Sequence, residues 1–140
     1  MSDAYEAMLK KVPLFSGLGS KELRHIGGLL TPLDVKVGTT LTREGHAGHE
    51  FVIIVEGSAS VSRDGVEIAT VGAGDFQGEI SILDGGPRTA TVVATTPMKV
   101  LVASHQEFLS LLDESPDIAR KMLPALAHRV RSLSGPSHVH

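Results

Sequence analysis

The chain has 140 residues, of which 41% are hydrophobic and 21% charged, as in a single folded domain with one core. Thirteen basic and 16 acidic residues give a net charge of −3, so no global field draws the protein to nucleic acid or to an anionic membrane. The absence of cysteine excludes disulfides, thiolate nucleophiles and cysteine-bound zinc.

The N-terminal segment predicts two short helices. Charges recur in MSDAYEAMLKK, and no apolar run reaches the roughly 20 residues that cross a bilayer, so we expect a cytoplasmic protein without a signal peptide or membrane span. Helical spacing predicts a first helix over 3–12, which Pro13 ends. A second helix is expected to follow Ser20 as its N-cap and to end at Pro32. Its apolar face would comprise Leu23, Ile26, Leu29 and Leu30.

From residue 33 to residue 103 the pattern changes to short β-prone runs separated by turns. The expected strands lie near residues 33–37, 39–43, 50–56, 58–63, 66–71, 88–94 and 97–103. The turn signals are Gly38, EGHAGH, Gly57, the RDG at 63–65, VGAG and TTP. Many short strands with frequent turns indicate an antiparallel β-roll or jelly-roll barrel, so the fold class is mainly β with flanking helices.

After these strands the period becomes helical again. Ser104 is expected to cap a short helix, and Ser115 with Pro116 is expected to open a longer one. Pro124 lies inside the longer helix and predicts a kink or weak point, because proline cannot donate the helical hydrogen bond. We therefore expect a single domain over 1–140, with helices over 1–30, a β-roll over 31–103, helices over 104–133 and a flexible tail over 134–140.

The stretch GDFQGEISILDGGPRTATV, residues 74–92, interrupts the alternating strand pattern. If residues 78–83 form a helical turn, its first amides point outward and favour an anion, and Arg88 offers a fork of donors that matches phosphate oxygens. A carboxylate such as Glu79 suits this place if the ligand also has a hydroxyl that needs an acceptor. The residues thus predict a pocket for a sugar joined to a phosphate.

This stretch resembles the phosphate-binding cassette of the cyclic nucleotide-binding domain family, here residues 74–91. Glycines at 38, 45 and 57 match the same family, and the resemblance runs from VPLFSGL through the C-terminal helices. It implies a β-roll with N-terminal helices and two C-terminal helices. The ligand-binding residues that it implies are Gly78, Glu79, Ile80, Ser81, Arg88, Thr89 and Ala90.

The resemblance also implies a role for most of these residues. Glu79 would accept a hydrogen bond from the ribose 2′-hydroxyl, and Arg88 would pair with the exocyclic phosphate oxygens. Backbone amides around Gly78, Ile80 and Thr89 would complete the phosphate cradle. The Thr89 hydroxyl could also reach the base, although the residue does not decide which base is bound. The expected ligand is cAMP in preference to cGMP, with no further cofactor.

The C-terminal helix would supply a lid over the purine from Leu123, Leu126 or Ala127, and ligand binding would repack the C-terminal helices. The expected function is therefore that of a regulatory sensor module. No DNA-binding or kinase segment follows the last helix, so the domain is expected to stand alone. Its partner would be a separate effector protein or a second copy bound through that helix.

Two other interpretations stay open at this stage. The residues His46, His49 and Glu50 could ligate a metal in a cupin-like β-barrel enzyme, although cupin histidines usually lie one residue apart on a strand. A degenerate domain could instead act only in protein–protein contacts. No Ser-His-Asp set or pair of catalytic carboxylates stands out, so we expect neither enzyme activity nor a metal site.

Overall fold

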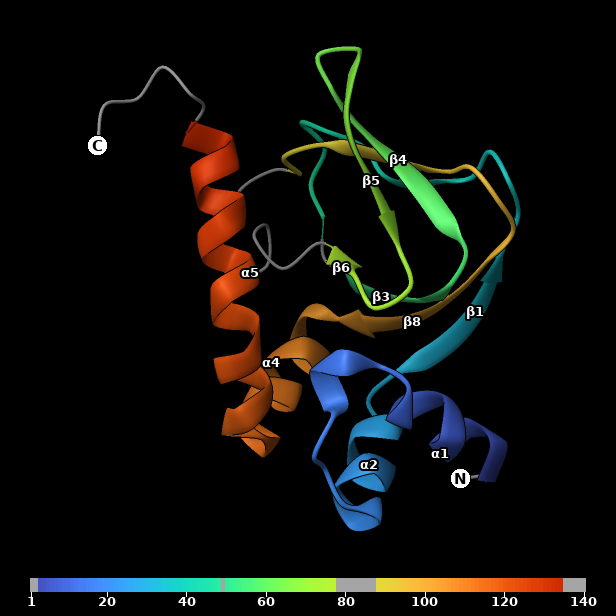
Figure 1. Cartoon of the computed structure of the whole chain (residues 1–140), viewed down its shortest axis with the longest axis vertical. Helices are drawn as coiled ribbons and strands as arrows, with labels where there is room; N and C mark the ends of the chain where they lie inside the picture. Colours follow the sequence, from blue (N-terminus) through green and yellow to red (C-terminus); the bar gives the residue numbers. More distant parts are fainter. Residues whose placement is uncertain (1–2, 49, 78–87, 135–140) are drawn as a thin grey trace.

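A computed structural model describes residues 3–48, 50–77 and 88–134 as helices packed on a two-sheet β-roll (Figure 1). One sheet has the order β1-β8-β3-β6 and the other the order β2-β7-β4-β5, and all pairs are antiparallel. The mainly β fold class expected from the sequence is confirmed. The strands are β1 (Thr31–Val35), β2 (Thr40–Thr42), β3 (Glu50–Glu56), β4 (Ser58–Arg63), β5 (Val66–Gly72), β6 (Phe76–Gln77), β7 (Thr91–Ala94) and β8 (Met98–Ser104).

Three strand predictions differ from the structure. The short strand β6 lies inside the 74–92 stretch and was not expected. The strand expected over 88–94 begins only at Thr91, because the backbone of Arg88 bonds instead to the loop at residues 45 and 46. The first strand contains Pro32, which we expected to end a helix; β1 lies at a sheet edge, where a residue without an N–H group is tolerated.

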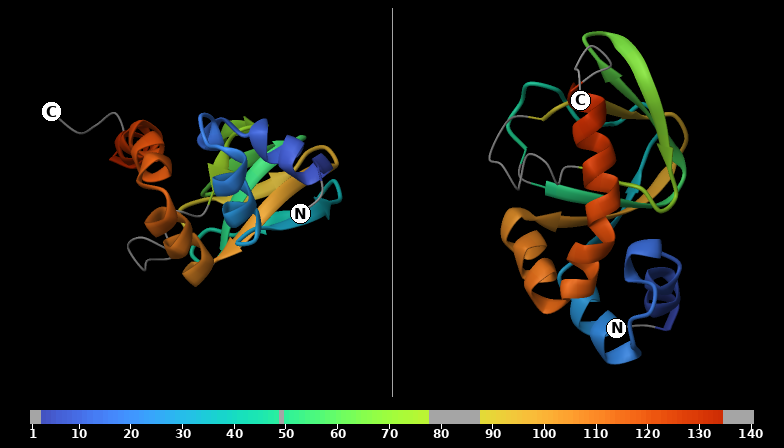
Figure 2. Two further views of the ribbon diagram at one scale, coloured as in Figure 1. Left: turned by 90° about the horizontal axis from the view of Figure 1, so that it is seen from below. Right: turned by 60° about the vertical axis from the view of Figure 1, so that its left-hand side comes forward.

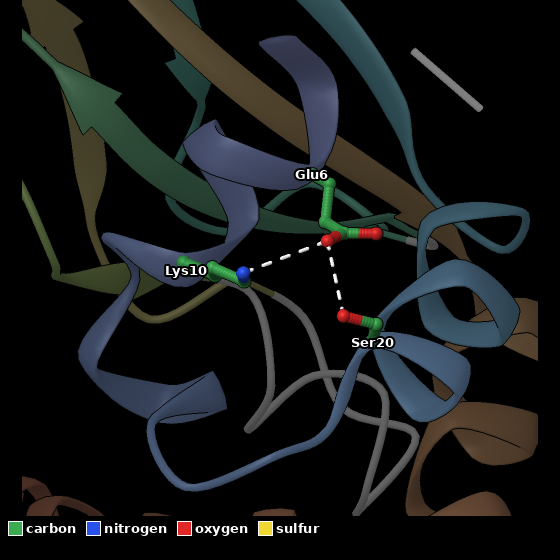
Figure 3. Close-up of polar contacts among 3 residues, drawn as sticks. All are labelled: Glu6, Lys10 and Ser20. Carbon is green, nitrogen blue, oxygen red and sulfur yellow. Dashed lines mark hydrogen bonds and ion pairs between the residues drawn. The ribbon is translucent and has the colours of Figure 1, made fainter. Parts of the chain in front are cut away.

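The N-terminal helices are shorter than predicted. They are α1 (Asp3–Lys10), the 3-10 turn η1 (Pro13–Phe15) and α2 (Ser20–Gly27). The expectation that Ser20 caps α2 is wrong, since Gly19 is the N-cap and makes no side-chain cap bond. The Ser20 hydroxyl instead donates to Glu6 at 3.1 Å, and Lys10 lies 3.5 Å from the same carboxylate oxygen (Figure 3).

The C-terminal helices begin where the sequence predicts. Helix α4 (His105–Glu114) has a capping box between Ser104 and Glu107, and α5 (Pro116–Ser134) starts at the expected proline and continues through Pro124. Within the described part of the chain, no helix is long and apolar enough to cross a membrane.

The strands β3 and β8 are buried on both faces, which divides the core in two. Alternate residues of β3 point to opposite sides, so Phe51 and Ile53 face the helices whereas Val52 and Ile54 face the inside of the roll. The cluster on the outer side of β3 joins α1, η1 and α2 to α4 and α5. Figure 1 shows α1, α2 and α4 below β3 and β8, with α5 to the left of the roll, and Figure 2 gives two further views of this arrangement. The run FVIIV therefore reads as continuous apolar sequence because each side has its own partner.

Positive backbone φ angles occur at the predicted turns. The β4–β5 hairpin turns at Asp64 and Gly65, whose φ values of 54° and 78° are those of a two-residue turn with left-handed residues. Gly57, with φ of 94°, also lies so close to Pro97 and Met98 that a Cβ there would overlap them. Glycine at this position is thus required by conformation and by space.

Candidate functional site

The segment that carries Arg88 lies against the loop between β2 and β3. The Arg88 amide donates to the His46 carbonyl at 2.9 Å, and the Gly45 amide donates to the Arg88 carbonyl at 2.9 Å. Two residues further on, the Thr42 hydroxyl donates to the Ala90 carbonyl at 3.0 Å. These contacts fix the backbone on both sides of the arginine.

The Arg88 side chain is held in the same way. The residue is only 9% exposed, and its Nη2 donates to the Glu50 carbonyl at 2.9 Å. Its Cδ, Nε and Cζ atoms lie over Gly48, where an added Cβ would overlap them. Because there is no side chain at position 48, the guanidinium can cross the loop to reach β3.

A cavity of about 470 Å³ opens beside this arginine. Its charged and titratable lining residues are Arg43, His46, Glu50 and Arg88, so cationic groups outnumber carboxylates although the whole chain is acidic. The remaining lining residues are Thr40, Leu41, Thr42, Ala47 and Gly48. The arrangement suits a small anion, since a guanidinium offers paired donors to phosphate or carboxylate oxygens.

Comparison with known proteins identifies the family at this point. The family model of the cyclic nucleotide-binding domain matches residues 32–115, which is more than half of the chain and includes Arg88. The chain belongs to the cyclic nucleotide-binding domain family. The resemblance seen in the 74–92 stretch is thereby confirmed for the domain as a whole.

The curated relatives of this cyclic nucleotide-binding domain are longer proteins. It is 39% identical over 110 residues to the cAMP-dependent protein kinase regulatory subunit of Yarrowia lipolytica, covering 77% of this chain and 29% of the relative. It is 38% identical over 112 residues to a cyclic nucleotide-gated potassium channel of Rhizobium etli, covering 80% of this chain and 31% of the relative. The chain thus spans about three tenths of the length of these relatives.

Solved structures agree with this fold. The chain matches PKAR CBD2 bound to Sp-2Cl-cAMPS with a TM-score of 0.78 and 27% identity, covering 94% of this chain and 90% of that one. It also matches the regulatory subunit of a cAMP-independent protein kinase A from Trypanosoma brucei, with a TM-score of 0.74 and 27% identity over 86% of this chain and 46% of that one. A triple variant of the latter, in which one threonine is replaced by arginine, is bound to cAMP in its A site.

The structure describes three of the seven predicted ligand-binding residues, which are consecutive in the chain, and one of them, Arg88, lines the cavity. Thr89 is half-buried and Ala90 is buried, and all three are fixed through backbone contacts. The other four lie outside the described residues: Gly78, Glu79, Ile80 and Ser81.

Sequence reasoning missed the residues that hold Arg88 and its neighbours. Gly48 stands in the EGHAGH turn, where it reads as an ordinary loop glycine. The Glu50 carbonyl and the Thr42 hydroxyl have no sequence signal, because they act on residues 38 and 48 positions away. Arg63 also belongs to this set, since its Nε donates to the Thr89 carbonyl at 3.0 Å.

Two residues named for the lid can be placed. Leu123 is 60% exposed and Ala127 is exposed, whereas the side chain of Leu126 lies outside the described set. For the metal alternative, His46 lines the cavity and His49 lies outside the described residues. Among residues 3–48, 50–77 and 88–134, no three His, Asp or Glu side chains are grouped so that they could hold a metal ion.

Proposed function

We propose that this chain is a regulatory sensor domain that binds cAMP in preference to cGMP, with Arg88 as the group that captures the cyclic phosphate. The observation that carries this proposal is the placement of Arg88, buried and fixed at the wall of a cavity that is also lined by Arg43 and by one carboxylate residue, Glu50. A preorganised arginine loses little side-chain freedom when an anion binds, and its charge is worth more where water is partly excluded.

The remaining contacts to the nucleotide are proposed from the family resemblance. Glu79 accepts a hydrogen bond from the ribose 2′-hydroxyl, and the backbone around Gly78, Ile80 and Ser81 cradles the phosphate. On the described side of the cassette, Thr89 and Ala90 complete the site. These residues belong to a ligand-binding unit made of the β-roll over 31–103 with its cassette over 74–91.

The preference for cAMP is supported by the relatives. The regulatory subunits of Yarrowia lipolytica and Aspergillus niger are named as cAMP-dependent, and they are 39% and 36% identical to this chain. A further solved neighbour, the regulatory domain of Toxoplasma gondii PKA, was crystallised with cAMP. The names of the kinase regulatory subunits and of the Rhizobium etli channel also suggest the kind of output, a kinase or a channel that responds to the nucleotide. The proposed partner is therefore an effector protein.

The conformational response is proposed to lie in α5. Its first half is anchored in the outer core by Ile118 and Met122, whereas Leu123 and Ala127 are exposed and available to cover a ligand. Between the two halves, Pro124 interrupts the helical hydrogen bonds. A ligand shifts such an equilibrium only if it binds one arrangement better, so the exposed residues must contact the nucleotide in one state and not in the other.

The proposal is tested by calorimetric titration of cAMP and cGMP into the wild-type protein, Arg88→Ala and Arg120→Ala. The control removes a cation on α5 whose side chain is 77% exposed. Arg88→Ala is expected to weaken cAMP binding by about a hundredfold, as for loss of a partly desolvated charged contact, and Arg120→Ala to leave it unchanged. No binding of either nucleotide by the wild type would reject the function, and full binding by Arg88→Ala would reject the site.

The alternative function is that of a domain with the same fold that binds other proteins but no nucleotide. One observation favours considering it, because the Trypanosoma brucei neighbour is described as cAMP-independent despite a TM-score of 0.74. The same protein binds cAMP in a form whose three substitutions include a new arginine. Within this chain, the feature that supports ligand binding is the buried Arg88 at the cavity, and the titration separates the two functions.

A further inference from the structure

The end of the β4–β5 hairpin contacts the segment that follows Arg88. The ladder between β4 and β7 ends with Ser62 opposite Thr91, so the next residue, Arg63, has no ladder partner on that side. Its side chain continues the contact, since Nε donates to the Thr89 carbonyl at 3.0 Å. The donor is a permanent cation, and hydrogen bonds from charged donors are about twice as strong as neutral ones.

The same hairpin also contacts the β2–β3 loop. The Asp64 amide donates to both carboxylate oxygens of Glu44, at 3.0 and 3.2 Å, and the Glu44 amide donates to the Thr91 hydroxyl oxygen at 3.1 Å. The positive φ angles of Asp64 and Gly65 shape the turn that presents this amide. The hairpin end thus connects the β2–β3 loop, at Glu44, with the chain after Arg88.

We propose that Arg63 is a positioning residue of the nucleotide site, acting through the carbonyl of Thr89. This inference rests on the proposed function. Three consecutive carbonyls, at residues 88, 89 and 90, are held by three donors: the Gly45 amide, the Arg63 guanidinium and the Thr42 hydroxyl. Two of these donors come from β2 and its loop, whereas Arg63 reaches in from β4.

The planarity of the peptide bond carries the effect to the ligand side. The Thr89 carbonyl and the Ala90 amide belong to one rigid plane, so the bond from Arg63 fixes the direction of both groups. Without it, that plane can rotate between its fixed neighbours, which turns the Thr89 carbonyl and the Ala90 amide. Both residues are in the proposed ligand-binding set, so the consequence is weaker and less selective nucleotide binding.

The test compares the wild type, Arg63→Ala and the control Arg120→Ala. In the ligand-free proteins, Arg63→Ala is expected to speed amide hydrogen exchange at residues 88–91 and to leave β8 unchanged. In calorimetry it is expected to raise the Kd for cAMP by about tenfold at unchanged stoichiometry, and to change the ratio of cAMP to cGMP affinity. If Arg63 had only a structural role, Arg63→Ala would lower the fraction of protein able to bind nucleotide but would leave the Kd for cAMP and the ratio of cAMP to cGMP affinity unchanged.

A double-mutant cycle with Thr89→Ala locates the effect. That variant removes the side chain of Thr89 but keeps the carbonyl that Arg63 contacts, so the two changes are expected to be additive in Kd if Arg63 acts through the carbonyl. Non-additive changes, which would assign the effect to the Thr89 side chain, or an Arg63→Ala protein with the Kd of the wild type, would overturn this inference alone. If the wild type binds neither nucleotide, the proposed function falls and this inference falls with it.

Discussion

Gly48→Ala is the sharpest single test of how Arg88 is held. The φ of Gly48 lies outside the left-handed region, so alanine suits the backbone, and this change alone would stabilise the fold by about 0.4–1 kcal/mol. The new methyl group, however, would overlap Cδ, Nε and Cζ of Arg88. Relieving such an overlap costs about 1–3 kcal/mol, and moving the guanidinium also breaks its bond to the Glu50 carbonyl.

The cost is expected to appear mainly in binding. An arginine displaced from the cavity wall should weaken cAMP binding by roughly tenfold to a hundredfold, or about 1.4–2.8 kcal/mol, while the free energy of unfolding falls by no more than about 2 kcal/mol. The assays are calorimetric titration and urea unfolding. Gly72→Ala is the matched control, because this residue of β5 has an extended backbone and the nearest described atom to the new Cβ, the Gly57 carbonyl oxygen, lies at an ordinary contact distance of 3.6 Å.

A second background shows whether the crowding acts on Arg88 itself. In Arg88→Ala the side chain that the methyl group would meet is gone, so adding Gly48→Ala should cost nothing further in affinity. The reasoning is refuted if Gly48→Ala binds cAMP as tightly as the wild type. It is also refuted if the two changes are additive.

Two further predictions concern the helices. Pro124→Ala should raise the free energy of unfolding by about 1–3 kcal/mol, seen as a higher Tm, because an exposed proline inside α5 is replaced by a residue that donates the missing bond; an unchanged or lower Tm would contradict this. Burial raises the pKa of Tyr5 above its ordinary value of 10.0, and its hydroxyl donates to the Gly27 and Leu30 carbonyls. The folded state therefore keeps the phenol proton more tightly, so the stability that the neutral Tyr5 hydroxyl contributes is present below pH 10 and is lost as the pH rises through the folded pKa. Urea unfolding at pH 8 and 10.5 should show a smaller loss of unfolding free energy at the higher pH in Tyr5→Phe than in the wild type. Equal losses in the two proteins would refute the assignment.

Much of the fold was predictable because its signals are local. Turn chemistry gave the hairpin at Asp64 and Gly65, and Ser104 as a helix cap gave the start of α4. Where the predictions were wrong, a distant partner decided the outcome. Ser20 did not become a cap because its hydroxyl bonds to Glu6 on another helix. Pro32 lies in a strand because β1 is at the sheet edge, which depends on the order of all four strands.

The candidate site divides in the same way. A basic residue after a glycine-rich turn was visible in the sequence as an anion ligand, and Arg88 does line the cavity. What fixes it was not visible, since Gly48 and Arg63 act through space on a segment that lies 26 to 40 residues away. A loop glycine and a strand-end arginine each have many ordinary explanations, and only the packing of three chain segments gives them a role.

The structure also supplies the physical connection between this site and the helices. Arg88 donates to the carbonyl of Glu50, and the next residue, Phe51, is fully buried and packs on Phe108 of α4 with ring centroids 4.4 Å apart. The same ring lies 5.7 Å from that of Phe76 in β6, which belongs to the cassette. Because interiors are densely packed, the conformational response proposed for the C-terminal helices would use the Phe51–Phe108 contact to receive a movement of the start of β3. Two adjacent residues of β3 thus contact the two regions: the Glu50 carbonyl accepts the hydrogen bond from Arg88, and the Phe51 ring packs on α4.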